Sequence, residues 1–152
     1  AAFSLVGLVV AGLFLARPEP AREGPPPAAA PAIDKTWHTE FMKAKAEDEK
    51  TRWCRVGAEA GDPAAMNLLG FRLAGGIGCA TDFEEAVLWG RKGAELGHSN
   101  AMFGYARMLE GGFGVPKDPA QAAHWYRRAL EAGDPQAPHH LERLLLKHPD
   151  LR

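Results

Sequence analysis

A repeat of 36 residues constrains this chain more than any other feature of its sequence. When residues 61–96 are aligned without gaps on residues 97–132, 12 of the 36 positions are identical. Average composition gives roughly two or three such identities by chance. The shared positions include two glycine runs, GGIG at 75–78 and GGFG at 111–114. A period of this length predicts a stack of small supersecondary units, each burying an apolar face against the next.

Each unit is expected to contain two helices. Asp62-Pro63 and Asp134-Pro135 combine an N-cap carboxylate with a proline at the first helical position. Asp82 and Asp118 are expected to cap the second helices, and Pro119 again stands in the first turn of the latter. Small and large apolar residues then recur at helical spacing. The positions predicted to face the core are Ala65, Leu69, Leu73, Ala101, Tyr105 and Leu109 in the first helices and Ala86, Trp89, Ala94, Ala122, Trp125 and Ala129 in the second.

The repeat also sets the predicted domain organisation. Residues 61–96 and 97–132 are the two complete units. Residues 33–60 are expected to form N-terminal capping helices, and residues 133–152 a C-terminal capping helix and tail. Such caps cover the apolar faces that end units of a solenoid otherwise expose to water.

The first 32 residues have a different composition. Residues 1–16, AAFSLVGLVVAGLFLA, carry no charge and are interpreted as a transmembrane anchor, with a secretory leader as the alternative. Residues 17–32 contain six prolines, which predicts an extended spacer. Arg17 and Arg22 are offset by Glu19 and Glu23, so no strong positive-inside signal follows the apolar run; this favours placing the solenoid on the extracytoplasmic, periplasmic side.

The repeat pattern resembles the Sel1-like repeat family, relatives of the tetratricopeptide repeats. The resemblance rests on an alanine, a leucine-glycine pair, a G-x-G-V loop, an aspartate, an alanine and a tryptophan. In the first unit these are Ala65, Leu69-Gly70, Gly76 to Cys79, Asp82, Ala86 and Trp89, with Cys79 in place of the loop valine and Gly90 in place of the second aromatic. The second unit has the full Gly112 to Val115 loop and Trp125-Tyr126, with Ala106 in place of the helix glycine. The resemblance implies an all-α fold, a short right-handed α/α superhelix, and binding of protein partners.

Several chemical functions are disfavoured by the sequence. A formal net charge of −1 lacks the basic excess of a nucleic-acid-binding domain. The GGFG loop follows a predicted helix and precedes Val115-Pro116, so it lacks the lysine and hydroxyl of a phosphate-binding loop; the glycines are expected to reverse the chain between helices. No cofactor is expected. His98, His124, His139, His140 and His148 show no metal-ligand spacing and are interpreted as solvated residues.

Nucleophilic catalysis has few candidates in this chain. Its serines are Ser4 and Ser99, and neither is near a base in the sequence. Cys54 and Cys79 occupy positions that the repeat predicts to face inward, which indicates two buried thiols. A Cys54–Cys79 disulfide remains an alternative if the domain lies in an oxidising compartment.

The surface of the first helices is therefore the predicted site. In helical-hairpin solenoids these helices line the face that binds partners. The positions predicted to face outward there are Asn67, Phe71, Asn100, Phe103, Arg107, Glu110, Gln136, His139 and Arg143. Phe71 and Phe103 are the expected anchors, because aromatic residues dominate interface energetics, and core packing is the alternative for each.

These observations predict a non-catalytic, membrane-anchored interaction module. It would assemble or stabilise a membrane-associated complex as an accessory subunit or assembly factor, with subunits of that complex as partners and the bilayer contacted through residues 1–16. The alternatives are a secreted or periplasmic adaptor and a hydrolase of cell-envelope components.

Overall fold

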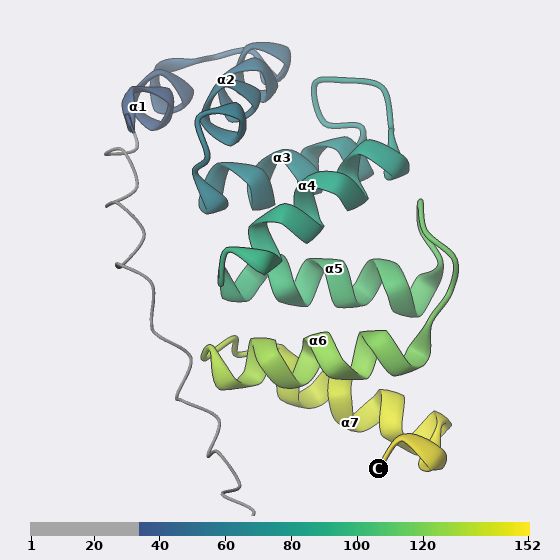
Figure 1. The fold of residues 1–152 in the computed structure, drawn as a ribbon. Helices are drawn as coiled ribbons and strands as arrows, with labels where there is room; N and C mark the ends of the chain where they lie inside the picture. The colour runs from purple at the N-terminus through teal and green to yellow at the C-terminus, as the bar shows by residue number, and fades with distance from the viewer. Residues whose placement is uncertain (1–33) are drawn as a thin grey trace, which may run out of the picture. The chain divides into compact units, whose positions relative to one another are not determined.

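The computed structural model describes residues 34–152, which form a stack of α-helices (Figure 1). The predicted anchor at 1–16 and the spacer at 17–32 lie outside these residues. Within residues 34–152, no helix has both the length and the apolar character needed to cross a membrane.

The helices follow one another along the stack in chain order (Figure 1). Consecutive helices pack against each other, and α3 also contacts α5 across the intervening helix. The described residues contain no strand, which confirms the predicted all-α solenoid. The elements are α1 (Thr36–Lys43), α2 (Glu47–Glu59), α3 (Pro63–Gly75), α4 (Phe83–Glu95), α5 (Ser99–Gly111), α6 (Pro119–Glu131), α7 (Ala137–Lys147) and the 3-10 turn η1 (Pro149–Leu151).

The aspartates cap the helices as the sequence predicts. The Asp62 carboxylate accepts hydrogen bonds from the backbone N–H groups of Ala64 and Ala65, at 2.8 and 3.3 Å. Asp82 and Asp118 accept in the same way from the N–H three residues later. At the last helix Asp134 binds the N–H groups of residues 136 and 137, and α7 begins at Ala137, two residues beyond the predicted start.

His98 takes the place of the capping aspartate at the start of α5. Its Nδ1 accepts a hydrogen bond from the N–H of Ala101 at 3.3 Å. Burial lowers the pKa of His98, so the neutral ring that can accept this bond is favoured. The interpretation of His98 as a solvated residue is therefore wrong, because the helix start requires an acceptor here.

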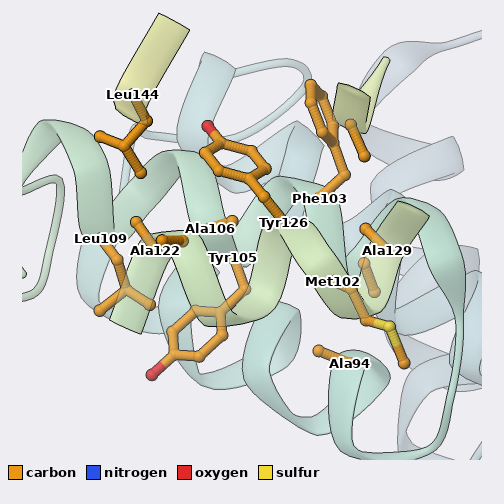
Figure 2. Packing of buried hydrophobic residues seen from close by; sticks show 13 residues of the cluster. Ala94, Met102, Phe103, Tyr105, Ala106, Leu109, Ala122, Tyr126, Ala129 and Leu144 are labelled. Atoms are coloured by element: carbon orange, nitrogen blue, oxygen red, sulfur yellow. The ribbon is translucent and has the colours of Figure 1, made fainter. Parts of the chain in front are cut away.

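The buried residues form two clusters, which contain the core positions that the repeat predicts. Every alanine, leucine and tyrosine assigned to the core in α3 to α6 is buried. The tryptophans differ from the prediction, because Trp89 and Trp125 are only partly buried and lie at the edges of their clusters. Tyr126 is the fully buried aromatic of α6 instead (Figure 2). One face of the Trp89 ring contacts the Lys92 ammonium, and one face of the Trp125 ring contacts the Arg128 guanidinium.

A buried arginine joins the N-terminal cap to the first repeat. The guanidinium of Arg72 donates from Nε to the Thr51 hydroxyl at 2.8 Å and from a terminal nitrogen to the backbone carbonyl and carboxylate of Glu47, each at 2.7 Å. The Thr51 hydroxyl in turn donates to the carbonyl of Ile77 at 2.7 Å. Because its donors are paired with groups of α2, the buried guanidinium of Arg72 holds α3 against α2.

The glycine loops hold each helix pair against the pair before it. Gly78 and Gly114 have φ values of 69° and 68°, in the left-handed region that glycine adopts without strain. A Cβ on Gly78 would overlap the carbonyl of Glu47, and one on Gly114 would overlap the carbonyl of Phe83. Both overlaps are with the first turn of the second helix in the preceding pair. The loops therefore serve the geometry of stacking, as the sequence predicts.

We expect Gly114→Ala to destabilise the solenoid more than Gly97→Ala. Both glycines have positive φ, but nothing lies within 4 Å of a Cβ on Gly97. Gly97→Ala should therefore cost only backbone strain of about 1–2 kcal/mol. Gly114→Ala adds an overlap with the backbone of Phe83, so its loss should be clearly larger in urea unfolding monitored by circular dichroism. Equal losses of stability in the two variants would contradict the close contact between Gly114 and Phe83.

We also expect part of the pH dependence of stability to come from His98. Its pKa is lower in the folded chain than the unfolded value of about 6.5. The resulting stabilisation is fully present above that unfolded value and is lost as pH falls through the folded pKa. His98→Asn keeps a capping acceptor and removes the titration. The variant should lose less stability than the parent chain between about pH 8 and pH 5 in urea titrations. If the variant and the parent chain lose the same stability between these pH values, the role of His98 is contradicted.

Candidate functional site

A groove of about 620 Å³ runs between α3 and α5, and we call it the central groove. Its floor includes Gly90 of α4, and Phe83 and Phe113 stand at its edge with their rings stacked at 5.6 Å. Six of the nine residues predicted to form the partner-binding face lie along it. These are Asn67, Phe71, Asn100, Phe103, Arg107 and Gln136.

A smaller hollow of about 260 Å³ adjoins the central groove and shares Arg107 and Phe113 with it. Two more of the predicted residues, Glu110 and Arg143, line this hollow. It is rich in basic side chains, which also include Lys117 and Lys147. His139, the ninth predicted residue, is exposed and lines neither cavity.

The two predicted aromatic anchors differ in their surroundings. Phe71 is 64% exposed on α3. Phe103 is only 7% exposed and lies with Tyr126 in the buried cluster (Figure 2). Its ring lies 5.7 Å from that of Tyr126 and 4.9 Å from that of His140. Phe103 therefore belongs to the core, the alternative that the sequence left open, although one edge of it reaches the groove. The repeat misleads here because Tyr126 and His140 cover Phe103, whereas the equivalent positions around the first unit are Gly90 and Gly104.

Glycines give the central groove its depth. Gly70, Gly90 and Gly104 come from three different helices and all line it. A Cβ on Gly70 would lie 3.1 Å from the carbonyl oxygen of Ala86, so α3 and α4 cross almost in backbone contact. A Cβ on Gly90 would meet only the Met108 sulfur at 3.8 Å and the Tyr105 Cβ at 4.0 Å. A methyl group therefore fits at Gly90, which lines the groove.

A buried polar cluster closes the C-terminal end of the second repeat. The Tyr126 hydroxyl donates to Glu110 Oε2 at 2.8 Å. A terminal nitrogen of Arg143 donates to both oxygens of Glu110 at 3.0 Å and lies 3.1 Å from His140 Nδ1. Glu110 and Arg143, both predicted to contact a partner, thus pair with each other inside the chain.

The pKa values of this cluster follow its hydrogen bonds. Burial favours the protonated form of Glu110, but the hydrogen bonds from Tyr126 and Arg143 outweigh it and lower the pKa of the carboxyl. Burial and then the bond to Glu110 raise the pKa of Tyr126. Burial, followed by Arg143 and Arg107, lowers the pKa of His140. His140 is therefore a neutral, half-buried part of the cluster rather than the solvated residue that we predicted.

The two cysteines are free thiols in the structure, so the alternative of a Cys54–Cys79 disulfide is not realised in it. Cys54 is fully buried, and burial raises its pKa to about 11. Its thiolate, the reactive form, is therefore scarce near neutral pH. Within residues 34–152 no three histidine, cysteine or carboxylate side chains gather as a metal site.

These features define a class of protein: a helical-hairpin solenoid with a groove along its first helices. The model of the Sel1 repeat matches residues 63–98 and 99–134, two units that start 36 residues apart. The chain thus carries two Sel1 repeats at these residues, as the resemblance seen in the sequence predicts. Sel1-repeat proteins mediate protein–protein interactions.

Solved structures support the same assignment. A Sel1 repeat protein from Oxalobacter formigenes superposes with a TM-score of 0.67 and 28% identity, over 76% of this chain and 49% of that one. The protective antigen c5321 of uropathogenic Escherichia coli, which displays an SLR fold, gives 0.56 and 25%, over 76% of this chain and 30% of that one. Cysteine-rich protein B of Helicobacter pylori, at 16% identity, shares the fold with a TM-score of 0.61 over 72% of this chain and 92% of its own.

The chain spans about half or less of the first two of these proteins. No curated protein sequence matches it.

Sequence reasoning missed the residues that shape the groove. Gly90 was recognised as standing in place of the second aromatic, but no cavity was predicted from it. α4 is continuous through Gly90, and the position without a side chain lines the groove. Phe83 and Phe113 were not predicted to lie at the site. The alignment of Gly90 with Tyr126 is the signal from which the groove could have been predicted.

We expect serine substitutions to separate the two phenylalanines by stability. Phe103→Ser should lower the free energy of unfolding by about 3 kcal/mol or more, because it empties a buried position. Phe71→Ser should change it by no more than about 0.5 kcal/mol, because the ring is largely in water. Urea unfolding of both variants tests this. A large loss for Phe71→Ser would place that ring in the core.

Proposed function

We propose that this chain is a non-catalytic module that holds a protein partner in the central groove. The observation that carries the proposal is the groove itself. It combines an exposed aromatic ring, Phe71, with a cation, Arg107, in a cavity of about 620 Å³ on a Sel1-repeat scaffold. Aromatic and arginine side chains are the residue types that contribute most to protein interfaces.

The exposed apolar surface beside the groove supports this assignment. Phe71, Phe83 and Phe113 are 64%, 40% and 51% exposed, and all three line the same groove. Scattered exposed apolar residues are ordinary, but a group around one cavity marks an interaction site. The partner-binding roles of Asn67, Asn100 and Gln136 follow from the same placement and remain predictions.

The proposal places the module at a membrane. Residues 1–16 would anchor it in the bilayer, and residues 17–32 would hold the solenoid on the extracytoplasmic side. The uncharged run and the absence of a basic excess after it support this topology. There the chain would act as an accessory subunit or assembly factor of a membrane-associated complex. A secreted or periplasmic adaptor, with residues 1–16 removed, is the second candidate, and N-terminal sequencing of the mature chain separates the two.

A hydrolytic function has less support from the described residues. Cys54 is buried with a raised pKa, and Ser99 begins α5. A nucleophile needs a positioned base within hydrogen-bond reach. The hydrogen bonds found within residues 34–152 include none from the Ser99 hydroxyl to a base. Labelling with a reactive β-lactam probe tests this alternative directly.

The full chain, purified from membranes in a mild detergent, should carry a partner protein with it. Phe71→Ser should reduce the amount of that partner at least severalfold while leaving the melting temperature unchanged, because the ring contributes to binding and little to folding. Leu88→Ser is the matched control, since Leu88 is 56% exposed but lies outside the groove. A chain that purifies alone and monodisperse would contradict the proposal, as would equal loss of partner in both variants.

A further inference from the structure

The two repeats differ most where the central groove is deepest. Tyr126 of α6 is fully buried, whereas the residue 36 positions earlier in α4 is Gly90. The structure therefore contains the same site twice, once with an aromatic side chain and once without it. The filled copy shows what the open copy can accept.

In the filled copy, Tyr126 has four neighbours from two helices. Its ring lies 5.7 Å from the rings of both Phe103 and His140. Its hydroxyl donates to Glu110, and Arg143 pairs with the same carboxylate. The site thus consists of a ring between two helices, a carboxylate beside it and an arginine that binds the carboxylate (Figure 2 shows Tyr126 beside Phe103 and Leu144).

In the open copy, the equivalents of these four neighbours are Asn67, Gly104, Ala74 and Arg107, and all of them line the central groove around Gly90. The ring is absent because Gly90 has no side chain. The carboxylate is absent because Ala74 stands where the second unit has Glu110. Only the arginine is retained.

Arg107 has no carboxylate partner within residues 34–152. The ion pairs found there are made by other cations, including the equivalent Arg143. Arg107 is exposed and its guanidinium lies 5.9 Å from the ring of Phe103. The adjoining hollow adds Lys117 and Lys147. The field at this end of the groove therefore favours an anion.

We infer that the slot above Gly90 receives a phenylalanine side chain of the partner protein and that Arg107 binds a carboxylate next to it in the partner's sequence. The partner supplies the two groups that Tyr126 and Glu110 supply in the second repeat. We choose phenylalanine rather than tyrosine because its ring needs no hydrogen-bond acceptor, and Ala74 provides none where Glu110 accepts the Tyr126 hydroxyl. This inference rests on the proposed function and specifies the chemistry of its partner.

Methionine methyl groups report on this slot. A Cβ on Gly90 would lie 3.8 Å from the sulfur of Met108, so a ring bound there must lie close to the Met108 methyl group. The full chain, labelled with ¹³C at its methionine methyls, is titrated with the blocked dipeptide acetyl-Glu-Phe-amide in dodecyl maltoside. We expect a saturable ring-current shift of Met108 and none of Met42, which is 69% exposed and outside the groove.

Two matched dipeptides separate the two contacts. Acetyl-Glu-Ala-amide should give no Met108 shift, because it has no ring. Acetyl-Gln-Phe-amide should bind the parent chain about threefold to fivefold more weakly than the glutamate dipeptide, the difference that a largely exposed ion pair provides. Arg107→Gln should remove that difference and leave the affinity for acetyl-Gln-Phe-amide unchanged.

Filling the slot from within the chain should abolish binding. The double substitution Gly90→Tyr with Ala74→Glu reproduces the ring, carboxylate and arginine of the second repeat. We expect this variant to melt at or above the temperature of the parent chain and to show no Met108 response to the dipeptide. Gly90→Ala is the control, because a methyl group fits at this position and leaves the slot open. If the double variant does not fold, Ala74→Glu alone should still weaken binding of the glutamate dipeptide.

Three results would overturn the inference. They are no Met108 shift in the parent chain, a shift that persists in the folded double variant, and a concentration-dependent self-association that Gly90→Tyr removes while the dipeptide has no effect. The last result would assign the groove to a second copy of the chain. A partner that is lost with Phe71→Ser but retained with Gly90→Tyr would leave the proposed function intact and reject the slot alone.

Discussion

The stacking of this solenoid depends on backbone-to-backbone contact at two glycines. Gly78 and Gly114 lie against the first turn of the second helix in the preceding pair, so closely that a Cβ on either would overlap a carbonyl group. This contact fixes the distance between successive helix pairs, because no side chain intervenes to adjust it. The apolar layers of the core then need only small residues at the crossings, and alanines fill most of them. The loop is therefore a spacer in a repeating structure, and its two copies are alike because the same spacing is needed twice.

Because the spacing is regular, most of the fold could be predicted from the sequence. The 36-residue period gave the two-helix unit, and Asp62, Asp82 and Asp118 marked helix starts by a local hydrogen bond that needs no tertiary context. Apart from His98, which caps its own helix, the predictions that were wrong concern side chains whose environment depends on a neighbouring unit. Phe103 is buried because α7 brings His140 against it, and the first unit has no such residue at the equivalent position.

The same dependence on neighbouring units limits how much of the site could be predicted from the sequence. Six of the nine residues predicted on the face of the first helices line the central groove, since helical periodicity decides which side a residue occupies, although Phe103 is one of them and is buried. The depth of the groove could not be predicted that way. It arises because Gly90 faces a helix that also carries a glycine, Gly104, and because Gly70 lets α3 approach α4 closely. Each glycine is unremarkable alone, and the cavity depends on the three meeting in the folded chain.

The C-terminal helix explains why the second repeat is closed at Tyr126 while the first is open at Gly90. α7 stands to the second repeat as α5 stands to the first, and it contributes His140 and Arg143 where α5 contributes Gly104 and Arg107. With Tyr126 and Glu110 these residues form a cluster in which the Tyr126 hydroxyl and a terminal nitrogen of Arg143 both donate to the Glu110 carboxylate. The aromatic site is therefore filled from within the chain in the second repeat and left open at Gly90 in the first. The repeat with the aromatic pair of the family pattern is thus closed at this site, and the repeat with Gly90 and Ala74 at these positions is the one that we propose binds the partner.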